Sequence, residues 1–285
     1  MIIALRIFLV LLVIGMVAHS SFGTPFVYDW STAAAPFNLD NDTVPLDNND
    51  GWINFAGLGN GSDDFVLNTL PPPLFSGNYF SGGTSGPPGS FGDDLYYRPN
   101  DGSFSFAIPA NAATVSMSML LRANNGNGTI RVGIIQGNPS AGGASALNFG
   151  LFGINAWGLR DELGVYTSSG TGAAALTDTT LRTYRATATL DMTNAGTATP
   201  TSLVVENLTS GGSEVIFSNQ PIKLTASGAV PDRTDPSLWG AMYMRVNGAP
   251  VDDLTISFTV VPEPSAFALG LIALGVLGYF TRRRR

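Results

Sequence analysis

Apolar and polar residues alternate in short segments along the middle of the chain. In residues 114–122 every second position from Val115 onward is apolar, and serines lie between several of them. Residues 129–136 and 183–192 repeat this pattern, and a further strand is expected at residues 202–208. A period of two places successive side chains on opposite faces of a strand, so each segment predicts a strand with one buried face.

Turn-forming residues separate these segments. Residues 124–128 read Asn-Asn-Gly-Asn-Gly, and because Asn and Gly accept positive φ, they predict a hairpin that pairs the strands before and after them. Further short strands are expected at residues 95–98, 103–106, 149–154, 157–160, 214–217, 222–224, 238–246 and 254–261. The predicted fold class is all-β, an antiparallel β-sandwich or jelly roll, flanked by an N-terminal signal helix and a C-terminal transmembrane helix. Because charged residues make up only 12% of the chain, long amphipathic helices are not expected in the body.

The first 23 residues have the pattern of a secretory signal peptide. Arg6 supplies a positive charge, and residues 7–17 form an apolar run that is too short to span a bilayer stably. Small residues follow at two places, so cleavage after Ser20 and cleavage after Gly23 both fit. The alternative is an uncleaved N-terminal anchor, which the polar segment that follows argues against.

The last 24 residues combine three features in a fixed order. Pro262, Glu263 and Pro264 precede an uncharged apolar segment, residues 266–280. A helix of about fifteen residues is about 22 Å long, whereas the hydrocarbon core is roughly 30 Å thick, so this segment is marginal as a permanent anchor. Four arginines follow: Arg282, Arg283, Arg284 and Arg285. Their charge resists translocation, which predicts a cytoplasmic end and a body on the outer side of the membrane.

This order resembles the PEP-CTERM sorting signal, with residues 262–264 as its tripeptide, residues 266–280 as its helix and the arginines as its basic end. The resemblance implies exosortase and the export machinery as partners, a precursor held in the membrane by the C-terminal helix, and a final place in the cell envelope, on the outer surface or outside the cell. The alternative is an ordinary tail anchor or stop-transfer helix. The predicted domains are a signal peptide (1–23), a single β-sandwich (24–261) and the sorting tail (262–285).

The body also resembles the concanavalin-like, laminin-G-type jelly rolls. Residues 184–191, a turn and residues 202–207 look like paired strands of those folds, and residues 251–256 look like their last strand. Such folds bind glycans, cleave them or only hold shape, so the resemblance does not select a function.

The predicted body is acidic. Residues 24–261 contain nine basic and twenty acidic residues, which gives a formal net charge of −11. A nucleic-acid surface needs the opposite sign, so no nucleic-acid partner is expected. An acidic exported body is suited to solubility, to association with cations, or to a neutral partner such as extracellular polysaccharide.

The body lacks the residues that most catalysis needs. The only histidine is His19, in the signal segment, and the chain has no cysteine, which excludes Ser-His-Asp and Cys-His catalysis and the usual zinc sites. Lys223 is the sole lysine and is expected to be a solvated residue of a strand. A glycosidase with two carboxylates is the remaining enzyme class, although the body has only Glu162, Glu206 and Glu214 as glutamates. We therefore predict a non-enzymatic body without catalytic residues.

Two binding chemistries stay open as hypotheses. Calcium accepts about six to eight oxygen ligands, and one Asp- and Asn-rich loop offers several, although both residues are also common in turns. Its candidate ligands are Asp40, Asp42, Asp47, Asn49 and Asp50. No other cofactor is expected. Aromatic side chains that reach the surface could stack on sugar rings, and the candidates are Trp52, Trp157 and Trp239.

Three functions follow from these features. The favoured interpretation is an exported, non-enzymatic protein of the cell surface or extracellular matrix. The alternative is a lectin-like, glycan-binding module of a surface or exopolysaccharide-associated protein. The third is a glycoside hydrolase.

Overall fold

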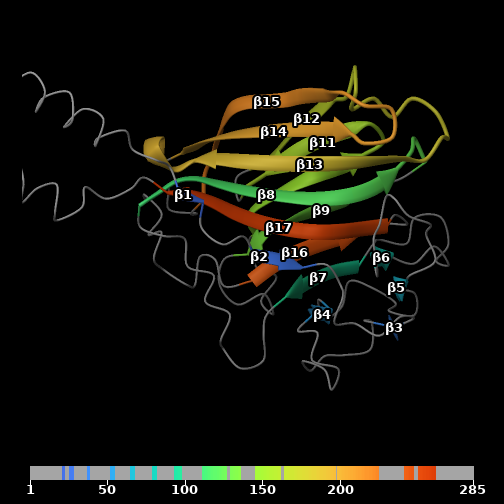
Figure 1. Cartoon of the computed structure of the whole chain (residues 1–285), viewed down its shortest axis with the longest axis horizontal. Coiled ribbons are helices and arrows are strands. Elements are labelled where there is room, and N and C mark those ends of the chain that lie inside the picture. Colours follow the sequence, from blue (N-terminus) through green and yellow to red (C-terminus); the bar gives the residue numbers. More distant parts are fainter. Residues whose placement is uncertain are drawn as a thin grey trace, which may run out of the picture.

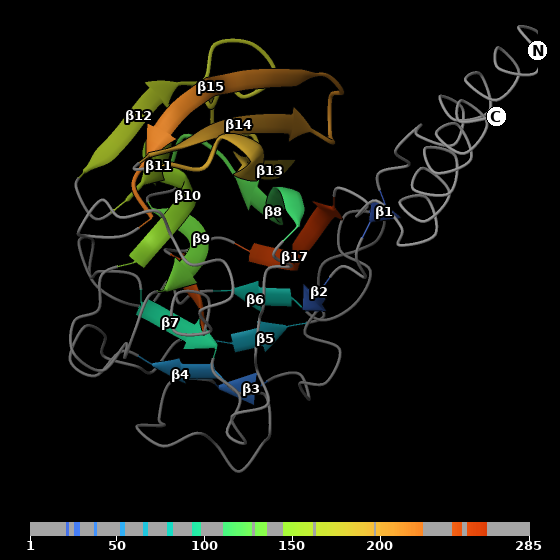
Figure 2. The same cartoon turned by 90° about the vertical axis from the view of Figure 1, so that its left-hand side faces the viewer.

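The structure is a computed structural model of the chain. It describes residues 111–126, 129–135, 145–161, 164–196, 198–224 and 250–260, together with the backbone of eight further strands at residues 21–22, 26–28, 37–38, 52–54, 65–67, 79–81, 93–97 and 241–246. Within these residues the chain forms antiparallel strands in two sheets that pack on each other as two layers (Figures 1 and 2). The prediction of an all-β antiparallel sandwich is therefore confirmed.

The larger sheet contains ten of the described strands. In spatial order its main path is β15 (Ser213–Ile222), β14 (Thr199–Asn207), β13 (Arg182–Asp191), β8 (Ala112–Ala123), β17 (Pro250–Val260), β6 (Tyr79–Ser81), β5 (Phe65–Leu67) and β3 (Phe37–Asn38). Two short N-terminal strands, β1 (Ser21–Phe22) and β2 (Phe26–Tyr28), also pair with β17.

The smaller sheet contains seven of the described strands. Its order is β12 (Val165–Ser169), β11 (Ala156–Arg160), β10 (Ser145–Gly153), β9 (Ile130–Ile135), β16 (Ala241–Val246), β7 (Asp93–Tyr97) and β4 (Trp52–Asn54). A single-turn 3₁₀ helix, η2 (Met192–Asn194), follows β13, with Asp191 as its N-cap.

The core lies between the two sheets and follows the period-two pattern of the sequence. On β8 every second residue from Val115 to Leu121 is buried, and on β13 the same holds from Tyr184 to Leu190. Phe149 of the smaller sheet belongs to the same buried cluster. Alternation in the sequence therefore identified the inward faces of the long strands correctly.

The predicted hairpin between residues 114–122 and 129–136 is wrong. β8 pairs with β13 and β17 in the larger sheet, whereas β9 pairs with β10 and β16 in the smaller one. The turn between them therefore carries the chain from one layer to the other. Its residues bond a distant loop instead, because the Asn125 N–H donates to the Asp178 carbonyl (3.0 Å) and the Asn124 side chain donates to the Thr179 carbonyl (2.9 Å).

Strand β12 was not expected from the sequence. Four of its five residues are exposed, and Val165 among them is 51% exposed. An edge strand with so little burial carries no alternation that a pattern could detect. The strand expected at residues 103–106 lies outside the described residues, as do the two predicted terminal helices. In the part of the chain that the structure describes, no helix is long and apolar enough to cross a membrane.

Gly133 marks the tightest contact between β9 and β10. A Cβ atom at this position would overlap the carbonyl oxygen of Leu147 and lie 2.5 Å from the Asn148 Cα. We expect Gly133→Ala to force the two strands apart and lower the free energy of unfolding by about 1–3 kcal/mol or more. Denaturant titration measures this change. Gly196→Ala is the matched control, since its Cβ would meet no atom within 4 Å, and an equal loss in both variants would contradict the prediction.

Candidate functional site

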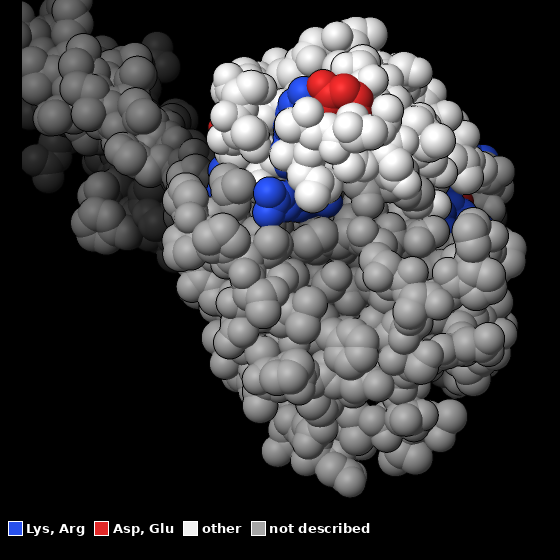
Figure 3. Space-filling model, turned by 90° about the vertical axis from the view of Figure 1, so that its right-hand side faces the viewer, with Lys and Arg blue, Asp and Glu red and all other residues white. Residues whose placement is uncertain are grey.

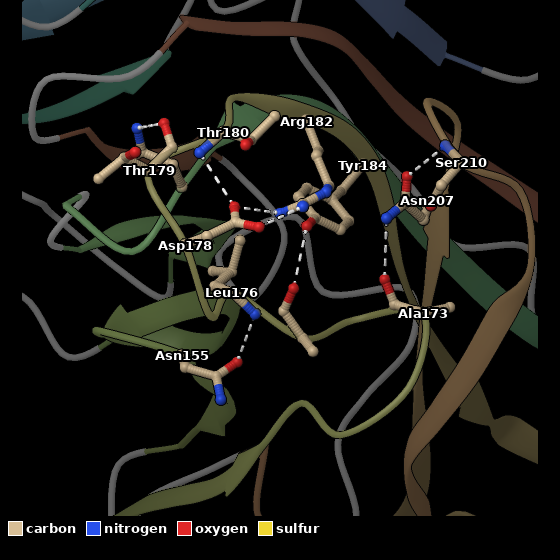
Figure 4. A network of polar contacts seen from close by, with 12 residues as sticks. Asn155, Ala173, Leu176, Asp178, Thr179, Thr180, Arg182, Tyr184, Asn207 and Ser210 are labelled. Carbon is tan, nitrogen blue, oxygen red and sulfur yellow. Dashed lines mark hydrogen bonds and ion pairs between the residues drawn. The ribbon is translucent and has the colours of Figure 1, made fainter.

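Four connections meet at one end of the sandwich, which we call the loop end. They are the turns after β8, β10 and β14 and the loop between β12 and β13, residues 170–181. Hydrogen bonds from the strands and turns hold this loop along much of its length, and Figure 4 shows a large part of the network. The loop is therefore a fixed part of the fold.

Glu214 of β15 is one anchor of this loop. Its Oε1 accepts hydrogen bonds from the Thr171 backbone N–H (2.9 Å) and hydroxyl (2.8 Å). Its Oε2 accepts from the backbone N–H groups of Gly172 (2.7 Å) and Ala174 (3.1 Å). The carboxylate thus satisfies three backbone donors that a loop of this kind would otherwise leave to water.

The same bonds set the charge state of Glu214. Burial by itself would raise the pKa of the Glu214 carboxyl, but the backbone N–H groups of Thr171, Ala174 and Gly172 and the Thr171 hydroxyl outweigh it and hold the pKa below the ordinary glutamate value. A depressed folded-state pKa means that the stabilisation is fully present above the unfolded-state pKa. It is lost as the pH falls through the folded-state pKa.

We therefore expect the loop to open more readily in acid. Amide hydrogen exchange at Thr171, Gly172 and Ala174 should lose protection as the pH falls below the ordinary glutamate pKa, after correction for intrinsic exchange rates. Glu214→Gln should cost about 1 kcal/mol of local stability at neutral pH, allowing for the solvent that reaches the group. Glu206→Gln is the control, because Glu206 makes an exposed ion pair with Arg185 (3.3 Å). Protection that does not depend on pH would contradict this assignment.

Asn155 anchors the loop from the turn between β10 and β11. Its φ is positive, at 51°, which Asn tolerates better than most residues do. In this conformation the side chain reaches the loop. The amide nitrogen donates to the Gly170 carbonyl (3.0 Å), and the amide oxygen accepts from the Leu176 N–H (2.9 Å). One side chain therefore fixes two points of the loop that lie six residues apart, and Figure 4 shows the bond to Leu176.

Asn207, at the end of β14, joins the loop to the β14–β15 turn. Its amide nitrogen donates to the Ala173 carbonyl (3.1 Å), and its oxygen accepts from the N–H groups of Thr209 (3.0 Å) and Ser210 (2.9 Å). The side chain is buried, so these bonds satisfy it where water does not.

Two buried aromatic residues support the loop from below. The Trp157 indole N–H donates to the Ala174 carbonyl (2.7 Å), and the Tyr184 hydroxyl donates to the Ala175 carbonyl (3.3 Å). Their rings meet edge to face with centroids 5.5 Å apart. Both residues are 0% exposed. This corrects the prediction for Trp157, whose ring faces are enclosed by the core and cannot stack on a sugar at the surface.

An ion pair closes the end of the loop where β13 begins. The two guanidinium nitrogens of Arg182 donate to the two carboxylate oxygens of Asp178 at 2.8 and 2.7 Å, and the Thr180 N–H donates to the same carboxylate (3.0 Å). These bonds lower the pKa of Asp178 to about 2, and the bond from Arg182 has the largest effect. The Asp178 carboxylate in turn raises the pKa of Arg182. The pair is bidentate, the geometry in which Arg and carboxylate match best.

Asp161 is a buried carboxylate that directly follows the last residue of β11. It is 2% exposed and accepts from the backbone N–H groups of Gly164 (3.0 Å) and Lys223 (2.9 Å). The Tyr166 hydroxyl lies 3.5 Å from it, and burial together with this carboxylate raises the pKa of that hydroxyl. Lys223, which directly follows β15, thus contacts Asp161 through its backbone N–H.

The loop end offers hydroxyl and backbone groups at its surface, and the charges of Asp178, Arg182 and Glu214 are paired or hydrogen-bonded within the fold. Figure 3 looks at the right-hand side of Figure 1, where the described surface is mostly uncharged and an acidic group lies beside a basic one. The exposed hydroxyl residues here are Thr171, Thr177, Thr179, Thr180, Thr209 and Ser210. No group of three or more acidic or histidine side chains that could hold a metal ion occurs in the described residues.

A second polar surface covers the outer face of the larger sheet. One row across the strands consists of hydroxyl residues in register, and a parallel row lies two residues along. The first row is Ser257, Ser116, Thr189 and Ser202, and the second is Thr255, Ser118 and Thr187. All seven are half-buried, and the Ser116 and Thr189 hydroxyl oxygens are 3.0 Å apart, within hydrogen-bond distance. We call these seven residues the hydroxyl face.

The structure does not place most of the predicted site residues. Trp52 lies in β4, whose side chains are not described, and Trp239 lies outside the described residues, as does Glu162. The five candidate calcium ligands between residues 40 and 50, the tripeptide at 262–264 and the arginines at 282–285 also lie outside them. These assignments stay predictions.

Sequence reasoning missed the anchors of the loop. Asn155 sits in a turn where Asn is common for its backbone alone, so its side-chain role left no separate signal. Glu214 bonds residues about 40 positions earlier in the chain, and only the paired strands bring them together. No local pattern predicts such a contact.

Comparison with known proteins identifies only the C-terminal part of the chain by sequence. Residues 260–285 match the family model of the PEP-CTERM protein-sorting motif. No curated protein matches the chain. A solved protein of unknown function from Shewanella oneidensis MR-1 is 11% identical, with coverage of 85% of this chain and 89% of the other and a TM-score of 0.44.

Two further solved structures are similar at the same level. The cellulose induced protein Cip1 is 12% identical, with coverage of 81% of this chain and 96% of the other and a TM-score of 0.40. The CBM2 module of the evolved Dit protein of Lactobacillus casei BL23 phage J-1 is also 12% identical, with coverage of 80% and 96% and a TM-score of 0.37. Likenesses this distant say nothing of function. The sequence match is different in kind: this chain carries a PEP-CTERM sorting motif, a signal that exosortase recognises, at residues 260–285, which implies an exported protein sorted to the cell surface.

Proposed function

We propose that this protein is a non-enzymatic component of the cell surface or extracellular matrix, with a structural or adhesive role. The observation that carries the proposal is the sorting motif. It begins at Val260, the last residue of β17, so the sandwich is the part of the chain that the motif sorts to the surface. Exosortase is its proposed processing partner, and the predicted C-terminal helix holds the precursor in the membrane until then.

Four of the described carboxylates support a structural role for the body. Glu214, Asp161 and Asp178 each hold backbone N–H groups of a loop or strand end, and Asp191 caps the 3₁₀ helix after β13. A pair of catalytic carboxylates must instead face a shared substrate site. A cavity between the sheets, lined by Met117, Val132 and neighbouring residues, has a volume of about 10 Å³, room for about one water molecule.

Replacement of the tripeptide tests the sorting part of the proposal. We expect a chain with Pro262→Ala, Glu263→Ala and Pro264→Ala to accumulate as an unprocessed precursor in the membrane fraction of a host with active exosortase. Ser265→Ala, directly after the tripeptide, is the control and should be processed normally. A triple variant that reaches the surface in the same form and amount as the native chain would refute sorting through this motif.

Glycan binding is the second candidate function, and the hydroxyl face favours it. Hydroxyl groups in register on an open sheet can donate to and accept from a neutral, hydroxyl-rich chain, and the seven residues carry no charge. A glycan array probed with the full chain tests this. Selective binding that is lost in Thr187→Glu and kept in Thr167→Glu, an exposed threonine of β12, would assign the role to this face. Selective binding that is insensitive to Thr187→Glu would place it elsewhere, and no binding would leave the structural role.

A further inference from the structure

Strand β17 is the last strand of the body and lies inside the larger sheet. On one flank it pairs with β8 from Val251 to Val260. On the other flank it pairs with β6 and β2, which come from the N-terminal third of the chain, and with β1, which lies in the predicted signal segment and stays on the body only if cleavage follows Ser20. Figure 1 shows β17 between β8 and the lower strands. The strand thus joins the beginning of the body to its middle.

The side chains of β17 are also part of the core. Val251 and Leu254 are 0% exposed, Ile256 is 2% exposed and Phe258 is 8% exposed. Without β17, these contacts would be missing, and β8 on one side and β6, β2 and β1 on the other would keep unpaired backbone groups. The two parts of the larger sheet would have no strand between them. Without β17 the larger sheet is therefore divided into two parts.

The position of β17 in the chain relates this step to export. The family match begins at Val260, the last residue of the strand, and only Val261 separates the strand from Pro262. An extended chain spans at most about 3.6 Å per residue, so the tripeptide begins within about 8 Å of the folded sheet. A chain that enters the export channel with its N-terminus first delivers β17 last, directly before the sorting tail.

We infer that the body crosses the membrane unfolded and that the exit of β17 from the export channel is the step that lets the sandwich close. Folding is then completed while the sorting motif is at the membrane, and exosortase meets the motif on the end of a closed sheet. This order depends on export alone. It stands whether or not the tail is later cleaved, so its failure is distinguishable from failure of the proposed sorting function.

Chains arrested during export test this order. A tightly folded domain fused behind Arg285 keeps the C-terminal part of the full chain in the channel. A flexible Gly/Ser spacer is then inserted either after Val261, downstream of β17, or after Gly248, upstream of it. Both insertions let the earlier strands emerge, but only the downstream spacer also lets β17 emerge. Protease added from outside reports whether the exported body has closed.

We expect protease resistance to appear with the downstream spacer, at the length that frees Val260, and not with an upstream spacer of equal length. The upstream-spacer chain without the fused domain is the control, and it must become resistant, because a longer connection between strands costs little. Resistance of both arrested chains would overturn the inference, since the body would then fold without β17. Sensitivity of both would overturn it as well, since the exit of β17 would not be the deciding step.

Discussion

Trp157→Ala is expected to lower the free energy of unfolding by about 3–5 kcal/mol, the range found when a large buried aromatic side chain is removed. Trp157 is fully buried, contacts the Tyr184 ring edge to face, and donates its indole N–H to the Ala174 carbonyl. The substitution therefore leaves a cavity under the loop of residues 170–181 and an unpaired carbonyl within it. Chemical denaturation of the exported protein measures the loss.

Trp157→Phe separates packing from hydrogen bonding. Phenylalanine keeps part of the ring packing but cannot donate to Ala174, so we expect a smaller loss of stability together with faster amide exchange in residues 170–176. Val165→Ala is the surface control, because this side chain is 51% exposed on the edge strand β12. A Trp157→Ala variant as stable as this control would show that the ring is not part of the core.

Ile256→Asp is expected to abolish folding of the body. Ile256 pairs with Met117 of β8 and Phe26 of β2, and its side chain is 2% exposed. A carboxylate at this position would have to be desolvated without a partner, at a cost of more than about 4 kcal/mol, which is comparable to the whole stability of many domains. We expect loss of the cooperative unfolding transition and degradation after export.

Ser257→Asp is the matched control for this variant. Ser257 is the next residue of the same strand, pairs with Ser116 and belongs to the half-buried hydroxyl face. The new carboxylate there stays within reach of water, so the loss should be no more than about 1 kcal/mol. If both variants unfolded alike, the effect would come from a charge anywhere on β17 and not from the loss of a core position.

The sequence was sufficient for the features that depend on local pattern. Alternation placed the inward faces of β8 and β13, and the strands expected at residues 129–136, 149–154 and 157–160 correspond to β9, β10 and β11. The paired strands at residues 184–191 and 202–207 are neighbours in the larger sheet, as the sequence indicated. The finer resemblance to concanavalin-like jelly rolls stays a prediction.

Features that depend on which strands meet could not be predicted in this way. The turn after β8 has the composition of a hairpin, yet it connects two layers, because both flanking strands bury their inward faces against the opposite sheet. Trp157 has a residue type that suits both sugar stacking and a core, and only its partners decide. Glu214 was predicted only as one of three glutamates of the body, and the structure shows that it bonds the loop between β12 and β13.

The C-terminal mass of the surface form tests the central claim most directly. The chain is isolated from the surface of a host with active exosortase and analysed by intact-mass spectrometry. We expect a body that retains β17 up to Val260 and lacks the arginines at 282–285. A surface form that still ends at Arg285 would contradict processing at this tail.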